Sequence, residues 1–105
     1  MILKLDIGKI SPGIYEVHCD GYSGSPTCHE SISAALAHYG ENIPPDFARF
    51  VDVRYHEVSL GTTAVARLAQ ESELMASELT SLMAAVYEAA EDMKTKLAVG
   101  ITIPP

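Results

Sequence analysis

The chain has 105 residues, of which 48% are hydrophobic and 20% charged, and its formal net charge is −7 at pH 7. This length fits one globular domain, and the composition is typical of a folded chain rather than a disordered one. No Lys/Arg-rich stripe is present for direct contact with nucleic acid or an anionic membrane surface, whereas a basic protein partner remains compatible with the charge.

Two stretches near the N-terminus, residues 2–7 and 14–19, alternate between apolar and polar residues as half-buried β-strands do. Their inward faces hold Leu3, Leu5 and Ile7 in the first stretch and Tyr15, Val17 and Cys19 in the second. We expect the two strands to pair as a β-hairpin with a six-residue loop over residues 8–13.

A Gly/Ser/Pro-rich loop over residues 20–27 leads into a predicted helix. Thr27 and Glu30 form a T-x-x-E capping box, so we expect the helix to begin near Cys28 and to end at Gly40. Its core-facing stripe would consist of Cys28, Ile32, Ala35, Leu36 and Tyr39.

Residues 47–58 alternate again and predict a third strand. The inward face would hold Val51, Val53 and Tyr55, and the outward face Asp52, Arg54 and His56.

Between Gly61 and Gly100 there is no Gly and no Pro, and apolar residues repeat every 3.5 positions. The stretch predicts a long amphipathic helix over residues 62–99, with apolar a, d and e heptad positions counted from Val65. A break near Ser72 or Ser81, giving a helical hairpin, is the alternative.

These elements predict an α+β fold of order β-β-α-β-α in a single domain of residues 1–105. A small three-stranded sheet would carry helices on one face, with a ββαβ portion over 1–60 and the long C-terminal helix over 62–99.

The long helix predicts a homodimer. At 1.5 Å per residue it would be about 55 Å long, too long for a domain whose radius of gyration should be about 13 Å. Its apolar stripe therefore needs a partner, most simply the same helix of a second copy. The expected interface is Met75, Leu79, Leu82, Met83, Val86, Ala90, Met93 and Leu97. Acidic g positions Glu71, Glu78 and Asp92 would repel in a parallel pair and favour an antiparallel one.

Two cysteines and two histidines flank the loop in the segment HCDGYSGSPTCHE, residues 18–30. The segment lacks the ligand spacing that is usual for a zinc site. The predicted strand and helix would place Cys19 and Cys28 on inward faces but His18 and His29 on outward faces, so the four side chains would not converge. We therefore expect two buried, reduced cysteines, with a disulfide or a nucleophilic Cys28 as alternatives. We expect no metal and no cofactor. No secretion signal and no membrane-spanning run is seen, so a cytoplasmic protein is expected.

The outer sheet face is the surface where a site is most plausible, and it would carry Glu16, His18, Asp52, Arg54 and His56. A solvated charged face is the usual role of such residues. We expect a non-catalytic, protein-binding homodimer: an adaptor, subunit or inhibitor that uses this patch for a partner. One alternative is a small enzyme or metal-binding protein that uses Glu16, His18, Asp52 and His56. Another is a phage- or plasmid-type inhibitor that presents an acidic surface.

Overall fold

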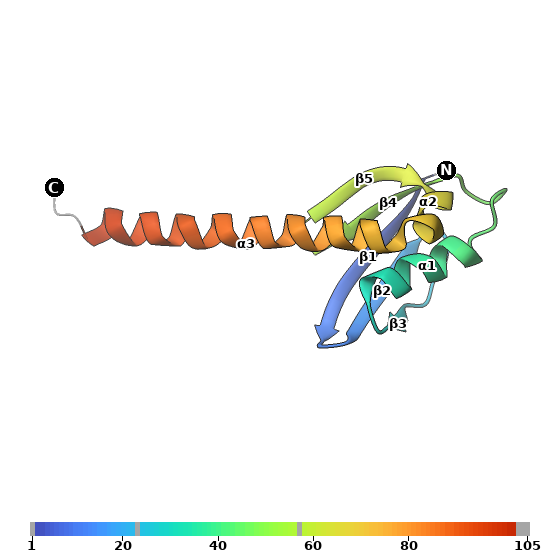
Figure 1. Cartoon of the computed structure of the whole chain (residues 1–105), viewed down its shortest axis with the longest axis horizontal. Helices are drawn as coiled ribbons and strands as arrows, with labels where there is room; N and C mark the ends of the chain where they lie inside the picture. Colours follow the sequence, from blue (N-terminus) through green and yellow to red (C-terminus); the bar gives the residue numbers. More distant parts are fainter. Residues whose placement is uncertain (1, 23, 57, 103–105) are drawn as a thin grey trace.

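The computed structural model describes residues 2–22, 24–56 and 58–102, with side chains as far as Lys94. The chain is a mixed α+β protein with a five-stranded sheet and a long C-terminal helix (Figure 1). The elements in chain order are β1 (Ile2–Ser11), β2 (Ile14–Asp20), β3 (Thr27–His29), α1 (Ile32–Asn42), β4 (Phe50–Tyr55), β5 (Val58–Ala64), α2 (Val65–Gln70) and α3 (Ser72–Thr102).

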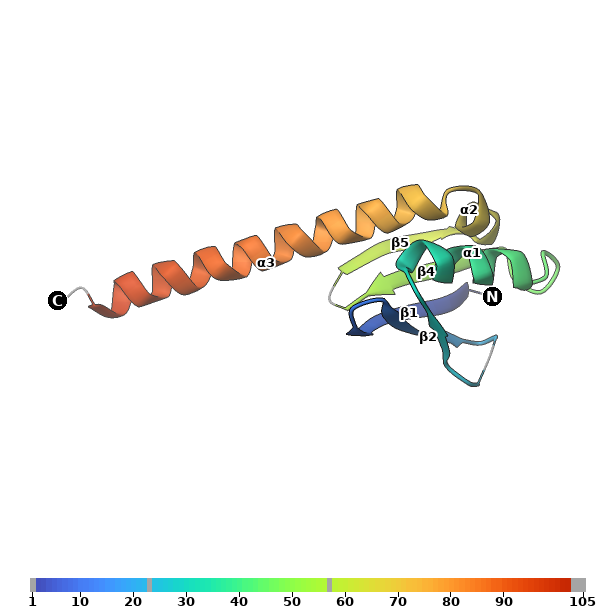
Figure 2. The ribbon, with the colours of Figure 1, turned by 60° about the horizontal axis from the view of Figure 1, so that its bottom comes forward.

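The strand order in the sheet is β3-β2-β1-β4-β5. β1 and β4 are parallel, and the other neighbours are antiparallel. A parallel neighbour needs a crossover connection, and α1 lies on that connection. The helices lie over one face of the sheet and leave the other face uncovered (Figure 2). The predicted three-stranded sheet was therefore too small, whereas the helices on one face agree with the prediction.

The β1–β2 hairpin is tighter than predicted. Strand pairing continues to Ser11 and Ile14, so Pro12 and Gly13 alone form the turn in place of the six-residue loop. Gly13 has a φ of 74°, which a side chain would make unfavourable, and Pro favours the position before such a glycine. The extra residues are absorbed by a bulge between Lys9 and Ser11.

The start of α1 was predicted four residues too early. Residues 27–29 form β3, which pairs with β2 through Tyr15 and His29. The N-cap is Ser31, whose Oγ accepts a hydrogen bond from the Ala34 amide at 3.0 Å. The helix also continues past the expected end at Gly40 to Asn42. The expected inward face is buried at Ile32, Ala35, Leu36 and Tyr39, but Cys28 lies outside the helix.

β5 is absent from the sequence prediction, which assigned residues 62–64 to the long helix. Those residues instead extend a β4–β5 hairpin, in which Val51 pairs with Thr63 and Phe50 with Ala64. The third strand was also predicted too long, since residues 47–49 and His56 lie outside β4. The buried alternation of Val51, Val53 and Tyr55 is observed.

The long helix is interrupted once, at Glu71, whose φ and ψ are −125° and 32°. Before the break, Val65 and Leu68 of α2 are buried next to α1. After it, Met75 and Leu79 of α3 are buried over the sheet. One straight helix cannot satisfy both contacts, so packing rather than a Gly or Pro causes the break. The chain does not fold back as a hairpin, because α3 continues as one rod (Figure 1).

The core lies between the sheet and the helices and ends well before α3 does. α3 leaves the domain near Met83, its last buried residue among those whose side chains are described. The molecule measures 63 × 27 × 25 Å and has a radius of gyration of 17.0 Å. A compact chain of this length would have a radius of gyration of about 13 Å. The projecting part of α3 accounts for the difference (Figure 2).

Candidate functional site: the outer sheet face and the projecting helix

Acidic and basic side chains alternate across the uncovered face of the sheet. In one row, Asp6 on β1 lies between His18 on β2 and Arg54 on β4. In the next row, Lys4 on β1 lies between Asp20 and Asp52. A cross-strand pair of opposite charges typically stabilises a sheet by a few tenths of a kcal/mol to about 1 kcal/mol. The face therefore carries side chains of both signs and is not uniformly acidic.

The expected cluster of Glu16, His18, Asp52 and His56 does not converge. β1 lies between β2 and β4, so residues on those two strands are separated by two strand spacings, roughly 10 Å. The one close contact among these four is an exposed hydrogen bond between His18 Nε2 and Glu16 Oε1, 2.9 Å apart. Asp52 accepts a hydrogen bond from Ser59 Oγ at 3.0 Å. This separation is too large for one metal ion or one shared proton.

His56 occupies the turn between β4 and β5 and has a φ of 51°, in the left-handed region. Its Nε2 accepts a hydrogen bond from the Lys9 amide at 3.3 Å, and its own amide donates to the Ile7 carbonyl at 3.3 Å. His56 thus stabilises the end of β1. Among the described residues, no group of three or more His, Cys, Asp or Glu side chains is placed to hold a metal ion.

The two cysteines differ from each other, contrary to the expectation that both are buried. Cys19 is fully buried, and burial, with Asp20 as a second cause, raises the pKa of its thiol to about 11. Cys28 is exposed and free, because residues 27–29 form an edge strand rather than the first turn of a helix. The expected inward direction of Cys28 was therefore wrong.

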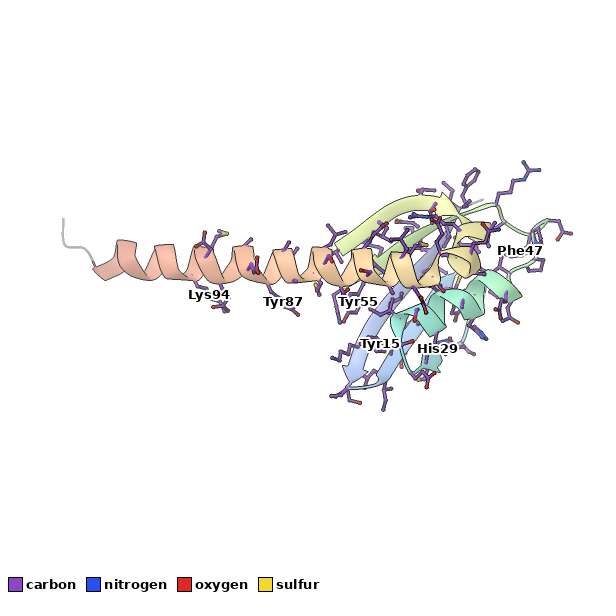
Figure 3. The ribbon with its side chains drawn as sticks, viewed as in Figure 1. Tyr15, His29, Phe47, Tyr55, Tyr87 and Lys94 are labelled. Carbon is purple, nitrogen blue, oxygen red and sulfur yellow. The ribbon has the colours of Figure 1, made fainter. Side chains whose placement is uncertain are left out.

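His29 was expected to point outward, but it is half-buried between β3 and α1 (Figure 3). Its Nε2 lies 2.8 Å from Thr27 Oγ1, which in turn lies 2.7 Å from the buried Tyr39 hydroxyl. The His38 ring is 4.9 Å away, centroid to centroid. Burial, and then the neighbouring His38, lower the pKa of His29. The sequence indicates this contact between residues 27–29 and residues 38–39 only if residues 27–29 are already known to form a strand.

The residues expected at a dimer interface fall into two groups along α3. Met75, Leu79 and Met83 are buried in their own domain and are not available to a partner. Leu82, Val86, Ala90 and Met93 are exposed, the large side chains to 42%, 40% and 63% for Leu82, Val86 and Met93. Leu97 lies beyond the residues whose side chains are described.

Three tyrosines mark the place where α3 leaves the sheet. The rings of Tyr15 and Tyr55 are 6.4 Å apart, and Tyr87 extends from α3 on the same side (Figure 3). Burial, with smaller effects of Tyr15 and Tyr87, raises the pKa of Tyr55. Sequence reasoning did not connect these residues, because their proximity depends on the direction in which α3 crosses the sheet.

Comparisons with protein-family models, curated proteins and solved structures return no match to this chain. Within the part of the chain that is described, no helix is long and apolar enough to cross a membrane. The features that bear on function are thus the uncovered sheet face and the projecting helix.

Proposed function

We propose that this chain is a non-catalytic, protein-binding protein that works as a homodimer, with the distal part of α3 holding two copies together. The role would be that of an adaptor, subunit or inhibitor, and the outer sheet face, with Glu16, His18, Asp52, Arg54 and His56, is proposed as its partner surface. β1 separates Glu16 and His18 on β2 from Asp52 and Arg54 on β4, and this separation favours a contact surface over a catalytic centre.

The observation that carries the proposal is an apolar stripe on α3 that extends beyond the core of its own domain. Leu82, Val86 and Met93 continue the face that is buried at Met75, Leu79 and Met83. Burying one such side chain contributes about 1.5–3 kcal/mol. Residues 84–102 would give an overlap of about 28 Å at 1.5 Å per residue, which is enough for five helical turns against a second copy.

Charge along the distal helix favours an antiparallel pair. Glu88, Glu91 and Asp92 form an acidic segment, followed by Lys94 and Lys96. An antiparallel arrangement with its two-fold axis near Met93 would place acidic residues opposite basic ones, whereas a parallel arrangement would place like charges together. Of the three acidic g positions, Glu71 and Glu78 contact Arg67 of their own chain at 2.7 and 3.4 Å, so the orientation rests on Asp92 and the other distal charges.

Light scattering at micromolar concentration tests the proposal, and twice the 11.3 kDa chain mass is expected. Val86→Asp should dissociate the dimer, because it places a charge on the apolar seam. Ala84→Glu introduces the same charge on the opposite side of α3 and should leave the dimer intact. A monomer in the unsubstituted protein, or equal dissociation by both variants, would contradict the proposed interface.

A further inference from the structure

The end of the domain opposite the projecting helix carries an apolar groove of about 650 Å³. Its walls are the C-terminal turn of α1 with Gly40 and Ile43, the loop into β4 with Ala48, and α2 with Ala66 and Ala69. The volume is in the range of protein sites that bind small molecules or side chains of a partner. The small side chains of Ala66 and Ala69 on α2 keep the groove open, because they do not extend into it.

One exposed aromatic residue lines this groove, and a second lies in the loop beside it. The chain has two Phe residues, and both are exposed, Phe47 to 42% and Phe50 to 49%. Phe50, the first residue of β4, lines the groove. Phe47 lies in the loop that leads into β4, and its ring is 5.5 Å from that of Tyr22, centroid to centroid (Figure 3). Exposed aromatic residues that gather beside a concave apolar surface are typical of the energetic centre of a protein interface.

Arg49 is the one charged side chain that lines the groove in the described part of the chain. It is exposed, and none of the ion pairs between described residues includes it, although Asp46 is in the same loop. The protein as a whole carries a net charge of −7. An unpaired guanidinium beside an apolar groove complements an acidic group that is attached to apolar side chains.

We propose that this groove binds a short segment of a partner protein in which apolar side chains flank a carboxylate. The apolar side chains would fill the groove between α1 and α2 and contact Phe50. The carboxylate would pair with Arg49. None of the five residues proposed as the partner surface and none of the α3 seam residues lines this groove, so the chain would have a second protein-binding site.

A phage-displayed library of random 12-residue peptides, selected on the full-length protein, tests this inference. The selected peptides should combine apolar residues with Asp or Glu. Ala66→Trp, which fills the groove from an exposed position on α2, should weaken their binding at least tenfold. Arg49→Glu should weaken it similarly, through charge reversal. Ala84→Trp is the matched control on α3 and should leave peptide binding unchanged.

Amide signals of Ala64, Ala66 and Ala69 should shift in NMR spectra when a selected peptide is added, which keeps the test valid if one variant fails to fold. A library that yields no peptide would overturn the inference, as would peptides that bind the Ala66→Trp variant equally well. So would selection of basic peptides alone. If Ala66→Trp changes the number of copies in the assembly, measured by light scattering, and no peptide binds, the groove is a contact between copies and the proposed partner is wrong.

Discussion

Gly40 of α1 lies directly against the backbone of α2 at Ala69. A β-carbon at Gly40 would overlap with the Ala69 amide nitrogen and would be 2.9 Å from Leu68 Cβ. α1 continues past Gly40 to Asn42, so the role of Gly40 is close helix packing and not helix termination. The pair fixes where α2 sits and therefore where α3 begins.

Gly40→Ala should destabilise the protein despite the better helix propensity of Ala. Propensity alone would stabilise the helix by about 0.5–1 kcal/mol, whereas forced separation of two packed helices typically costs 1–3 kcal/mol. We expect a net loss in the free energy of unfolding measured with urea. Gly24→Ala is the matched control, since a β-carbon there meets nothing within 4 Å. Equal stability of the two variants would contradict the described contact.

The two thiols should differ sharply in reactivity. At pH 8, a thiol reagent should modify Cys28 rapidly, because this side chain is exposed. Cys19 should react only after denaturation, because it is fully buried and its pKa is raised to about 11. Mass spectrometry should find one modified cysteine in native buffer and two in denaturant. Cys28→Ser should remove the native modification altogether, and rapid labelling of that variant would place Cys19 at the surface.

At position 56, replacement of the histidine by glycine should destabilise the protein less than replacement by a β-branched residue. Its φ of 51° is unfavourable for most residues and is most unfavourable for Val or Ile. Both His56→Gly and His56→Val remove the exposed contact with the Lys9 amide. The Gly variant should therefore be more stable than the Val variant by about 1–3 kcal/mol. Thermal unfolding measures the difference, and a more stable Val variant would exclude a left-handed conformation here.

Stability should fall between neutral pH and pH 5 in a manner that depends on His29. The pKa of His29 is lowered in the folded protein, so the unfolded chain binds a proton first. Stability is complete above the unfolded pKa of about 6.5 and declines as the pH falls below it, until the folded form is also protonated.

His29→Gln should reduce this decline, measured by urea unfolding at pH 8, 6.5 and 5. The groups that face His29 are Thr27, His38 and Tyr39, and none is a carboxylate that would favour the charged imidazole. Comparison with the variant removes the contribution of the other titrating groups. An identical decline in both proteins would show that His29 is not coupled to folding.

Spin labels at the start of α3 should report the orientation of the proposed dimer. Glu73 is exposed near the first turn of α3, and Glu73→Cys in a Cys28→Ser background offers one reactive position. With an antiparallel axis near Met93, labels on two copies would be on the order of 60 Å apart. In a parallel pair the helix axes would be about 8–10 Å apart, and the labels would be correspondingly close. Pulsed dipolar spectroscopy separates the two arrangements.

Residue periodicity predicts which face of each strand or helix is buried better than it predicts the number and arrangement of the strands. Leu3, Leu5 and Val53 are buried as their period-2 alternation indicates. β3 escapes the prediction because three residues are too few for a period. β5 had a weak signal in the β-branched Thr62 and Thr63, which the absence of a helix breaker outweighed.

The candidate site was limited by topology rather than by chemistry. Glu16, His18, Asp52 and Arg54 lie on the uncovered face, but the sequence does not reveal that β1 separates β2 from β4. The break at Glu71 is next to Ser72, one of the two break positions weighed as an alternative, but no Gly or Pro marks it, and its cause is the contact between α2 and α1. Long-range packing therefore determines which of the predicted residues can meet.

The projecting α3 also changes how a single copy behaves in solution scattering. A radius of gyration of 17.0 Å is what a compact protein of roughly 217 residues would give. A single copy, with its 105 residues, thus has the radius expected of a compact particle about twice as long in sequence. Elution volume and angular scattering respond to this elongation as they would to association. Forward scattering intensity depends on mass and not on shape, and it is the quantity that separates one copy from two.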